Sequence, residues 1–551
     1  MMIRNIKILF LVLAVTLMGS CELDLLDNPN AVTVNNADIN YILNSVELGA
    51  RNNFGDFSGL GGAFTRMFHL GGAAIYDNSS SPAGSDGRWN TAYAGVLADV
   101  NALIPLAEKG ELFVHAGIGR VVRAMVLMNL VDYFGDVPYS QALDPSNFNP
   151  GVDKGADVYA AALADLNKAI ENFNAKSKGG ATTDLFYGGS TDNWIRAANT
   201  LKLKLNLNLR LINKAGATSA INALITDNKL ISTAAQNFVF KYGTNLTNPD
   251  TRHPSYAGQY SPTGGGDYQS NSYMGTLHNA KGFPDPRIRF YFYRQTIKNS
   301  TDVNEIRCIN NSKPAHYSEN DVFCYATSVG YWGRDHLSNE GIPPDGLKRT
   351  AYGVYPSGGL YDNDAGVGVS LGAGAGGAGI RPIMMRSFVD FMLAEAALTL
   401  GTSGNPRDLL KSAIEKSMAD VRSLAMGSSE AGKITAFESS KGFVWADEVK
   451  KYVDKVLADY DAAASDDARL NIIATEYWIA LYGNGIEAYN LYRRTGKPAN
   501  QQPGLDPNVG PFPRSIYYPN SYIARNKNAV QKSNMSVQVF WDNNPANNFI
   551  K

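Results

Sequence analysis

Histidine, cysteine and surplus charge are all scarce in this sequence. Its 551 residues include only 6 histidines and 3 cysteines, and its 50 basic side chains nearly balance 51 acidic ones. Binding to nucleic-acid phosphates calls for a basic surplus, so the balance argues against a nucleic-acid-binding protein. Hydrophobic residues make up 44% of the chain and charged residues 18%, a composition that can bury a large core and is not typical of disorder.

Long apolar runs are scarce as well. The run Ile8 to Met18 follows the basic residues Arg4 and Lys7, but it is shorter than the roughly 20 residues that a membrane-spanning helix needs. It therefore predicts a signal peptide over residues 1–20. Two small residues then precede Cys21, which resembles a bacterial lipobox, although Met18 stands where leucine is usual. An ordinary secretory signal that contains a cysteine is the alternative.

A lipobox makes Cys21 the acylated N-terminus of the mature chain. Acylation anchors a protein to a membrane without a spanning segment, and no later run in the sequence approaches spanning length. Residues 21–35 are acidic and contain a proline, so we expect them to form a flexible tether.

The other two cysteines, Cys308 and Cys324, lie 16 positions apart. An exported protein meets oxidising conditions, which favours a disulfide. Two free thiols are the plain alternative. A metal site that also uses His316 is less favoured, because the spacing matches no standard zinc motif.

Helical periodicity is strong in two blocks, and it predicts a mainly α protein. The predicted helices form four pairs with short connectors, which indicates tetratricopeptide-like hairpins that bury their apolar stripes by stacking. An ordinary helical domain is the alternative. The eight helices are expected at 92–110, 113–134, 155–173, 191–213, 384–400, 406–425, 445–462 and 466–482.

Between the blocks lies a region of different composition, about 243–382, rich in glycine, proline, tyrosine and asparagine. A structureless insert of this length is unusual. We therefore expect a loop-rich lobe with a few short strands, for example at 289–295, and a similar tail over 498–551. The helical scaffold then occupies about 92–242 and 383–497.

Familiar catalytic motifs are missing. The glycine-rich run at 372–379 contains GxGxxG, but a dinucleotide site needs a strand before it and a helix opening within it, and neither is predicted there. P-loop, HExxH, GxSxG and CxxC patterns do not occur in the sequence. We therefore expect no cofactor, no metal and no catalytic residues.

Several segments together resemble the SusD/RagB family of outer-membrane nutrient-binding lipoproteins, and in particular its second SusD-like subgroup. They occur in the family's order along nearly the whole chain, which makes the resemblance specific. The segments are DNPNAVT (27–33), RWNTAYAGVLADVNALI (88–104, similar to the family's first helix after the N-terminal loop), YFGDVPYSQAL (133–143), YWGRDHLSNEGIPPDGLKRTAYGVYPSGG (331–359), MLAEAAL (392–398), AYNLYRRTGKP (488–498) and PRSIYYPNSYIARNKNAV (513–530).

The resemblance implies a single domain over residues 36–551, with four tetratricopeptide-like helix pairs and a loop-rich lobe that supplies most of the ligand site. It also implies a lipid-anchored outer-membrane protein that faces the cell exterior. Such a protein captures oligosaccharides, or in some members peptides, and delivers them to a SusC-like TonB-dependent barrel without catalysis. A surface glycosidase or peptidase and a structural surface protein are the competing hypotheses.

Sugar rings present apolar C–H faces that aromatic side chains can cover, while polar side chains fix the hydroxyls. Aromatic residues beside polar ones are therefore the candidates for ligand contact. For Trp89 a purely structural role in sealing the helix start is the alternative, and for the GRDH stretch a structural role is equally open. The candidates are Trp89, Asn90, Tyr268, Tyr273, Trp332, Arg334, Asp335 and His336.

A few residues are expected to be structural. Trp194, Trp478 and the turn from Tyr133 to Tyr139 are predicted to lie in the core. Arg493 and Arg494 are expected to pair with carboxylates near a helix end.

Overall fold

The computed structural model describes residues 38–71, 75–264, 266–341, 343–545 and 549. The predicted signal peptide, Cys21 and the tether lie outside the described residues. Within them helices dominate, and the named strands are few and short. Strand β1 (Phe238–Lys241) pairs antiparallel with β4 (Ile380–Met384), and β2 (Phe292–Tyr293) pairs antiparallel with β3 (Ala351–Tyr352).

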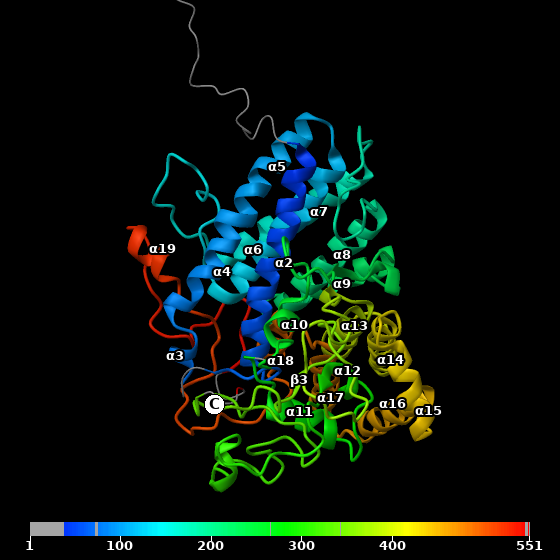
Figure 1. Cartoon of the computed structure of the whole chain (residues 1–551). Coiled ribbons are helices and arrows are strands. Elements are labelled where there is room, and N and C mark those ends of the chain that lie inside the picture. Colours follow the sequence, from blue (N-terminus) through cyan, green and yellow to red (C-terminus); the bar gives the residue numbers. More distant parts are fainter. Residues whose placement is uncertain (1–37, 72–74, 265, 342, 546–548, 550–551) are drawn as a thin grey trace, which may run out of the picture.

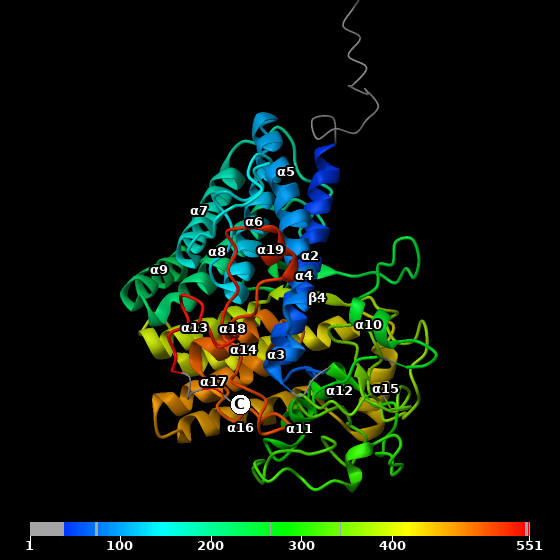
Figure 2. The same ribbon diagram turned by 90° about the vertical axis from the view of Figure 1, so that its left-hand side faces the viewer.

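Helix α2 (Ile39–Phe64) was not predicted, although its 26 residues make it the longest helix described. It begins where the Asp38 side chain accepts a hydrogen bond from the backbone N–H of Asn40. In both views it runs from the upper helices down to the loop-rich lobe (Figures 1 and 2). The segment 88–104, expected to be the first helix, is therefore the second major one.

The first helical block packs its helices one after another along the chain. The four predicted helices are confirmed, and α9 is an addition. The first of them opens earlier than expected, with α4 (Asp86–Asn90) and a π-helical stretch, η2 (Thr91–Leu97). The helices that follow are α5 (Ala98–Lys109), α6 (Phe113–Phe134), α7 (Gly155–Asn174), α8 (Thr191–Asn208) and α9 (Lys214–Asp227).

Helix α6 corrects one expectation from the sequence. By length and composition it is long and apolar enough to cross a membrane, although no run after the signal peptide was expected to approach spanning length. Its most apolar window is 89% buried inside the protein. This burial marks α6 as a core helix that other helices surround.

The second block contains the other four predicted helices, with α15 and α18 as additions. Helix α13 packs against α14 and α17, and it also contacts α8 and α9, so it joins the two blocks. The result is the mainly α, tetratricopeptide-like scaffold that the sequence predicted. The helices are α13 (Arg386–Leu400), α14 (Pro406–Met426), α15 (Ala431–Lys441), α16 (Trp445–Ala462), α17 (Asp466–Ala480) and α18 (Gly485–Thr495).

The lobe and the tail are loop-rich, as predicted, with four short α-helices among their described residues. Of the strand expected at 289–295 only β2 forms, because α12 occupies the preceding residues. The lobe lies below the first helical block and beside the second (Figure 2). These helices are α10 (Pro254–Gln259), α11 (Asn271–Asn279), α12 (Ile288–Tyr291) and, in the tail, α19 (Asn520–Arg525), whereas the short helix α3 (Tyr76–Ser79) lies between α2 and α4.

Most of the residues expected to be structural are buried. Trp194, Trp478 and Tyr133 lie in the core, and Tyr139, at the other end of the predicted turn, is half-buried against it. Arg494 forms ion pairs with carboxylates, as expected. Arg493 instead donates to the backbone carbonyl oxygens of Asp132 and Arg514.

Candidate functional site

A cleft of about 930 Å³ lies where the C-terminal half of α2 meets the lobe. Its walls come from α2 and the residues just after it, from the start of α10, from the segment 334–341, and from the loop that leads into α18. The volume falls within the range of about 300–1,000 Å³ that is usual for small-molecule sites.

Unpartnered polar atoms are concentrated on the walls of this cleft. Each of the five atoms concerned is buried and lacks a hydrogen-bond partner within the protein, and each belongs to a residue that lines the cleft. Buried polar groups are nearly always satisfied, so the side chains that carry these atoms are candidates for contact with a bound water or a ligand. The atoms are His69 Nδ1, His253 Nε2, Ser338 Oγ, Ser357 Oγ and Arg381 Nε.

The protonation of His253 follows from its position at the start of α10. Its Nδ1 accepts a hydrogen bond from the backbone N–H of Ser255 at 3.2 Å. Burial, with help from Arg381 and Arg51, holds the pKa of this imidazole well below its usual value, so the ring is neutral near pH 7. In a neutral ring whose Nδ1 accepts, Nε2 carries the proton. His253 therefore has a buried N–H donor, beside the cleft, that lacks a partner within the protein.

The other imidazole that lines this cleft, that of His69, is neutral for similar reasons. Burial, and then the nearby Arg334, lowers its pKa to about 3. Burial also raises the pKa of the carboxyls of Asp56 and Asp267. Each of these residues lines the cleft.

Phe68 supplies an apolar surface on the cleft wall. Its ring is half-buried and packs on Tyr482 and Tyr352, with centroids 5.5 and 6.0 Å away. Tyr482 and Tyr352 line the cleft too, but both are almost fully buried. Phe68 is thus the cleft aromatic with the most surface left for a ligand.

Arg381 reaches the cleft because a glycine of α2 makes room for it. A side chain at Gly55 would place its Cβ 3.0 Å from Nη2 of Arg381, tighter than ordinary contact. With glycine at position 55, Nη2 of Arg381 donates to the hydroxyl of Tyr242 at 3.2 Å. This bond fixes the guanidinium, while its Nε stays unpartnered.

Two of the eight residues predicted from the sequence, Tyr268 and Arg334, line this cleft. The guanidinium carbons of Arg334 and Arg349 lie 4.2 and 3.9 Å from the Tyr268 ring centroid, and the Tyr268 hydroxyl bonds Asp345. Only 7% of Tyr268 stays exposed. Its ring is therefore a buried support for Arg334 and offers little face for stacking.

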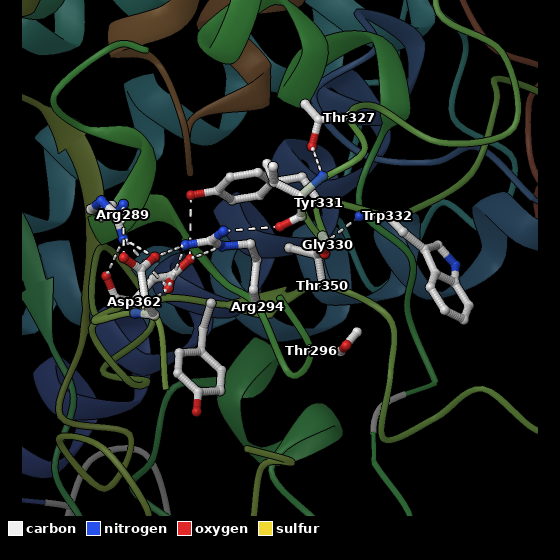
Figure 3. A network of polar contacts seen from close by, with 12 residues as sticks. Arg289, Arg294, Thr296, Thr327, Gly330, Tyr331, Trp332, Thr350 and Asp362 are labelled. Carbon is white, nitrogen blue, oxygen red and sulfur yellow. Dashed lines mark hydrogen bonds and ion pairs between the residues drawn. The ribbon is translucent and has the colours of Figure 1, made fainter. Parts of the chain in front are cut away.

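Polar contacts fix the two residues, Tyr331 and Trp332, that shortly precede Arg334 (Figure 3). The N–H of Trp332 donates to the Thr350 hydroxyl at 2.9 Å, and the Tyr331 hydroxyl bonds Asp362. Asp362 in turn pairs with Arg294 at 2.6 Å. These contacts hold the backbone that presents Arg334 to the cleft.

Trp332, Asp335 and His336 do not line the cleft. The Trp332 ring packs against the two cysteines, and the His336 imidazole bonds the Tyr76 hydroxyl. Asp335 accepts from the backbone N–H of Cys324 at 2.9 Å, and burial raises the pKa of its carboxyl to about 6. Each is buried and engaged in packing, in keeping with the structural alternative for the GRDH stretch.

The remaining candidates also lie outside the cleft. Trp89 is 8% exposed and packs on Tyr522, with ring centroids 4.7 Å apart, in keeping with its structural alternative. Asn90 is exposed on the surface. Tyr273 is fully buried, and its hydroxyl donates to the carbonyl of Ile479.

Sequence reasoning missed Phe68, His69, His253 and Arg381. Two of them follow α2, the helix that was not predicted, and the other two lie at the start of α10 and on β4. No spacing in the sequence relates these positions. The two histidines are among only six in the chain, but nothing in the sequence marks them as neighbours in space.

Cys308 and Cys324 form a disulfide, with their Cα atoms 5.5 Å apart. The structure therefore selects one of the three alternatives left open by the sequence. Among the residues that the structure describes, no group of three or more His, Cys, Asp or Glu side chains is placed to hold a metal ion.

The disulfide leads to a direct prediction. Denatured but unreduced protein, exported to an oxidising compartment, should leave Cys308 and Cys324 unlabelled by a thiol reagent, and both should label after reduction. Mass spectrometry of the peptides measures this. Labelling of both cysteines without reduction would contradict the bridge.

Comparison with known proteins agrees with this architecture. A family model described as "Starch-binding associating with outer membrane", of the SusD-like type, matches residues 29–519. The chain belongs to this SusD-like family. A search of curated proteins finds no match.

Solved structures of SusD-like proteins share the fold. A SusD/RagB family protein from Bacteroides thetaiotaomicron matches with a TM-score of 0.67 at 19% identity, over 92% of this chain and 100% of that one. A chitin-binding protein matches at 0.65 and 22% identity over the same shares. A chitin-binding SusD homologue from Flavobacterium johnsoniae matches at 0.63 and 18%, again over the same shares.

Proposed function

We propose that this SusD-like protein is a lipid-anchored, cell-surface binding protein that captures oligosaccharides in the cleft beside α2. It delivers them to a SusC-like TonB-dependent transporter in the outer membrane and catalyses no reaction. The family description and the chitin-binding neighbours support a glycan as the ligand.

The observation that carries the proposal is the set of five unpartnered polar atoms in the cleft. They include a hydroxyl pair, an imidazole N–H and a guanidinium N–H, which together can donate to and accept from sugar hydroxyls. Phe68 adds an apolar surface for the C–H face of a sugar ring.

The charge of the cleft also favours a neutral ligand. The charged side chains among the described lining residues are two carboxylates, Asp56 and Asp267, and two guanidiniums, Arg334 and Arg381. The two negative and two positive charges cancel, and the imidazoles of His69 and His253 are neutral near pH 7. A strongly charged peptide or an acidic polymer would gain little from this balance.

Isothermal titration with a panel of neutral hexasaccharides tests the proposal. The panel contains chitohexaose, maltohexaose, xylohexaose and mannohexaose, with neutral hexapeptides as the peptide arm. The proposal expects saturable binding of at least one hexasaccharide. Binding of peptides alone, or of no member of the panel, would contradict it.

Binding should hardly depend on pH between 6.5 and 8.0. The lowered pKa values of His69 and His253 keep both rings neutral across this window, so the donors and acceptors of the cleft do not change. Titrations at pH 6.5, 7.2 and 8.0 should give affinities within twofold of one another. A severalfold change centred near pH 6.5 would show that an imidazole titrates at its usual pKa.

Separate experiments address anchoring, partnership and catalysis. Metabolic labelling with a fatty acid should mark the wild type and not Cys21→Ala, and labelling of both would contradict anchoring at Cys21. Purification from membranes should recover a large TonB-dependent barrel. Prolonged incubation with the bound hexasaccharide should leave it intact, whereas release of shorter sugars would favour the glycosidase hypothesis.

A further inference from the structure

A second cleft of about 860 Å³ lies between α11 and the C-terminal part of α17. Its walls are α11, the C-terminal part of α17, the end of the disulfide-closed loop and the segment after α18 that runs through residues 498–503. The described lining residues share no position with those of the cleft beside α2.

Helix α11 presents a continuous polar stripe to this second cleft. Ser272, Gly275, Thr276 and Asn279 follow the i, i+3, i+4, i+7 spacing of one helical face, and all four line the cleft. The opposite face carries residues such as Tyr273, which is fully buried in the core. The helix thus separates a hydrophobic side from a side that carries two hydroxyls and an amide.

The disulfide loop forms the opposite rim. It can approach α11 closely because residue 275 is glycine, where a Cβ would lie 2.9 Å from Val322. The Val322 backbone exchanges two hydrogen bonds with the Gln502 side chain, at 3.0 and 3.1 Å. Asp335 supports the same loop by accepting from the N–H of Cys324. The rim is therefore fixed on both sides.

One wall residue lacks a partner. Gln501 is 6% exposed, lines the cleft, and has a buried side-chain nitrogen, Nε2, with no hydrogen-bond acceptor in the protein. In the neighbouring Gln502, by contrast, both the amide oxygen and the amide nitrogen are hydrogen-bonded to the Val322 backbone. A buried amide N–H without an acceptor is costly unless something else accepts from it. Gln501 therefore adds to the wall of this cleft an amide donor that an oxygen atom of a ligand or a water can satisfy.

The chemistry of the second cleft is nearly neutral. Asp321 is its one described carboxylate, and its Oδ2 accepts from the N–H of Ser318. No lysine or arginine is found among the described lining residues. Amides and hydroxyls that surround a space of this size match an uncharged, hydroxyl-rich ligand.

We propose that this second cleft is a second oligosaccharide-binding site of the same protein, with Gln501 as a hydrogen-bond donor and α11 as its polar wall. The class of ligand in this inference rests on the proposed function, whereas the location of the site rests on the residues of the second cleft. Two sites in one lobe would hold either two short glycans or two stretches of a long one.

Titration with the four hexasaccharides named above tests the second site. Thr276→Trp fills the cleft from the half-buried face of α11, and Gln501→Leu removes the unpartnered amide with little change of shape. Asn172→Leu is the matched control, because Asn172 is 5% exposed, has an unpartnered amide oxygen and lies on α7 away from both clefts. Circular dichroism verifies that each variant is folded.

The wild type should bind two hexasaccharides per protein, or one whose affinity depends on both clefts. Thr276→Trp should remove one site or weaken the single one about tenfold, with a smaller loss in Gln501→Leu and none in Asn172→Leu. Binding that is unaffected by both cleft variants overturns the second site but leaves the proposed function intact. If the paired change Phe68→Ala and Arg381→Ala has no effect while Thr276→Trp abolishes binding, the second site stands and the first does not.

Discussion

Replacing Glu395 with alanine is expected to lower the free energy of unfolding by about 3–5 kcal/mol, the usual result of removing one partner from a buried ion pair. Glu395 is 1% exposed and accepts two hydrogen bonds from Arg494, at 2.8 and 2.9 Å. Arg210 adds a third contact at 3.0 Å. Without the carboxylate, the fully buried Arg494 keeps only Glu487 as an ion-pair partner.

The matched control is Glu415→Ala. Glu415 pairs with Lys411 on the surface of α14, and both side chains are more than 40% exposed. Such pairs contribute about 0.3–0.5 kcal/mol, so the control should barely differ from the wild type. Urea unfolding followed by circular dichroism measures both variants. Equal losses in the two would show that the buried cluster does not act as described.

The same buried ion pairs predict how the stability of the protein changes in acid. Although burial alone would raise the pKa of Glu395, Arg494 and Arg210 together hold it below the usual value. A carboxyl with a lowered folded pKa contributes stability above its unfolded pKa and loses that contribution as the pH falls through the folded value. The Glu395→Ala variant should therefore lose less stability than the wild type when the pH drops below about 4.

The second large effect is expected for Gly485→Ala. Gly485 is the first residue of α18, where that helix meets α2, and a Cβ there would overlap the backbone of Ser58 and of Gly62. Backbone atoms cannot move aside as a flexible side chain can. Overpacking of this kind usually costs about 1–3 kcal/mol, and we expect the upper end of that range.

Gly432→Ala is the control for this effect. Gly432 is the second residue of α15, and a Cβ there would meet nothing within 4 Å. Alanine at such a position should be neutral or stabilising by up to about 1 kcal/mol. Because Ser58 and Gly483 line the cleft beside α2, Gly485→Ala should also weaken oligosaccharide binding. A variant as stable as the wild type would contradict the close helix contact.

The scaffold was predictable because its helices carry regular apolar stripes. Helix α6, for example, was placed from Phe113 to Phe134 with the bounds that the structure gives. Helix α2 was missed because five glycines interrupt its sequence and weaken its helix propensity. Three of those glycines have structural roles, since Gly55 makes room for Arg381, and Gly61 and Gly62 lie against Gly485.

The cleft was predictable only in part. Arg334 was found because its aromatic, polar neighbourhood stands out in the sequence. The side chains that share the cleft with it, such as Phe68 and His253, come from elements distant in the chain. Trp332 was predicted to contact the ligand because it is aromatic, but its ring packs on the disulfide.

Titration of the mature protein and its cleft variants with the best-binding hexasaccharide tests the central claim most directly. Phe68→Ala and Arg381→Ala remove the exposed aromatic surface and an unpartnered donor of the cleft beside α2, while Phe148→Ala removes an aromatic that is 81% exposed and does not line that cleft. We expect each cleft variant to bind about tenfold more weakly, or about 1.4 kcal/mol, and the control to bind like the wild type. Unchanged affinity in both cleft variants would contradict the assignment of this cleft as the oligosaccharide site.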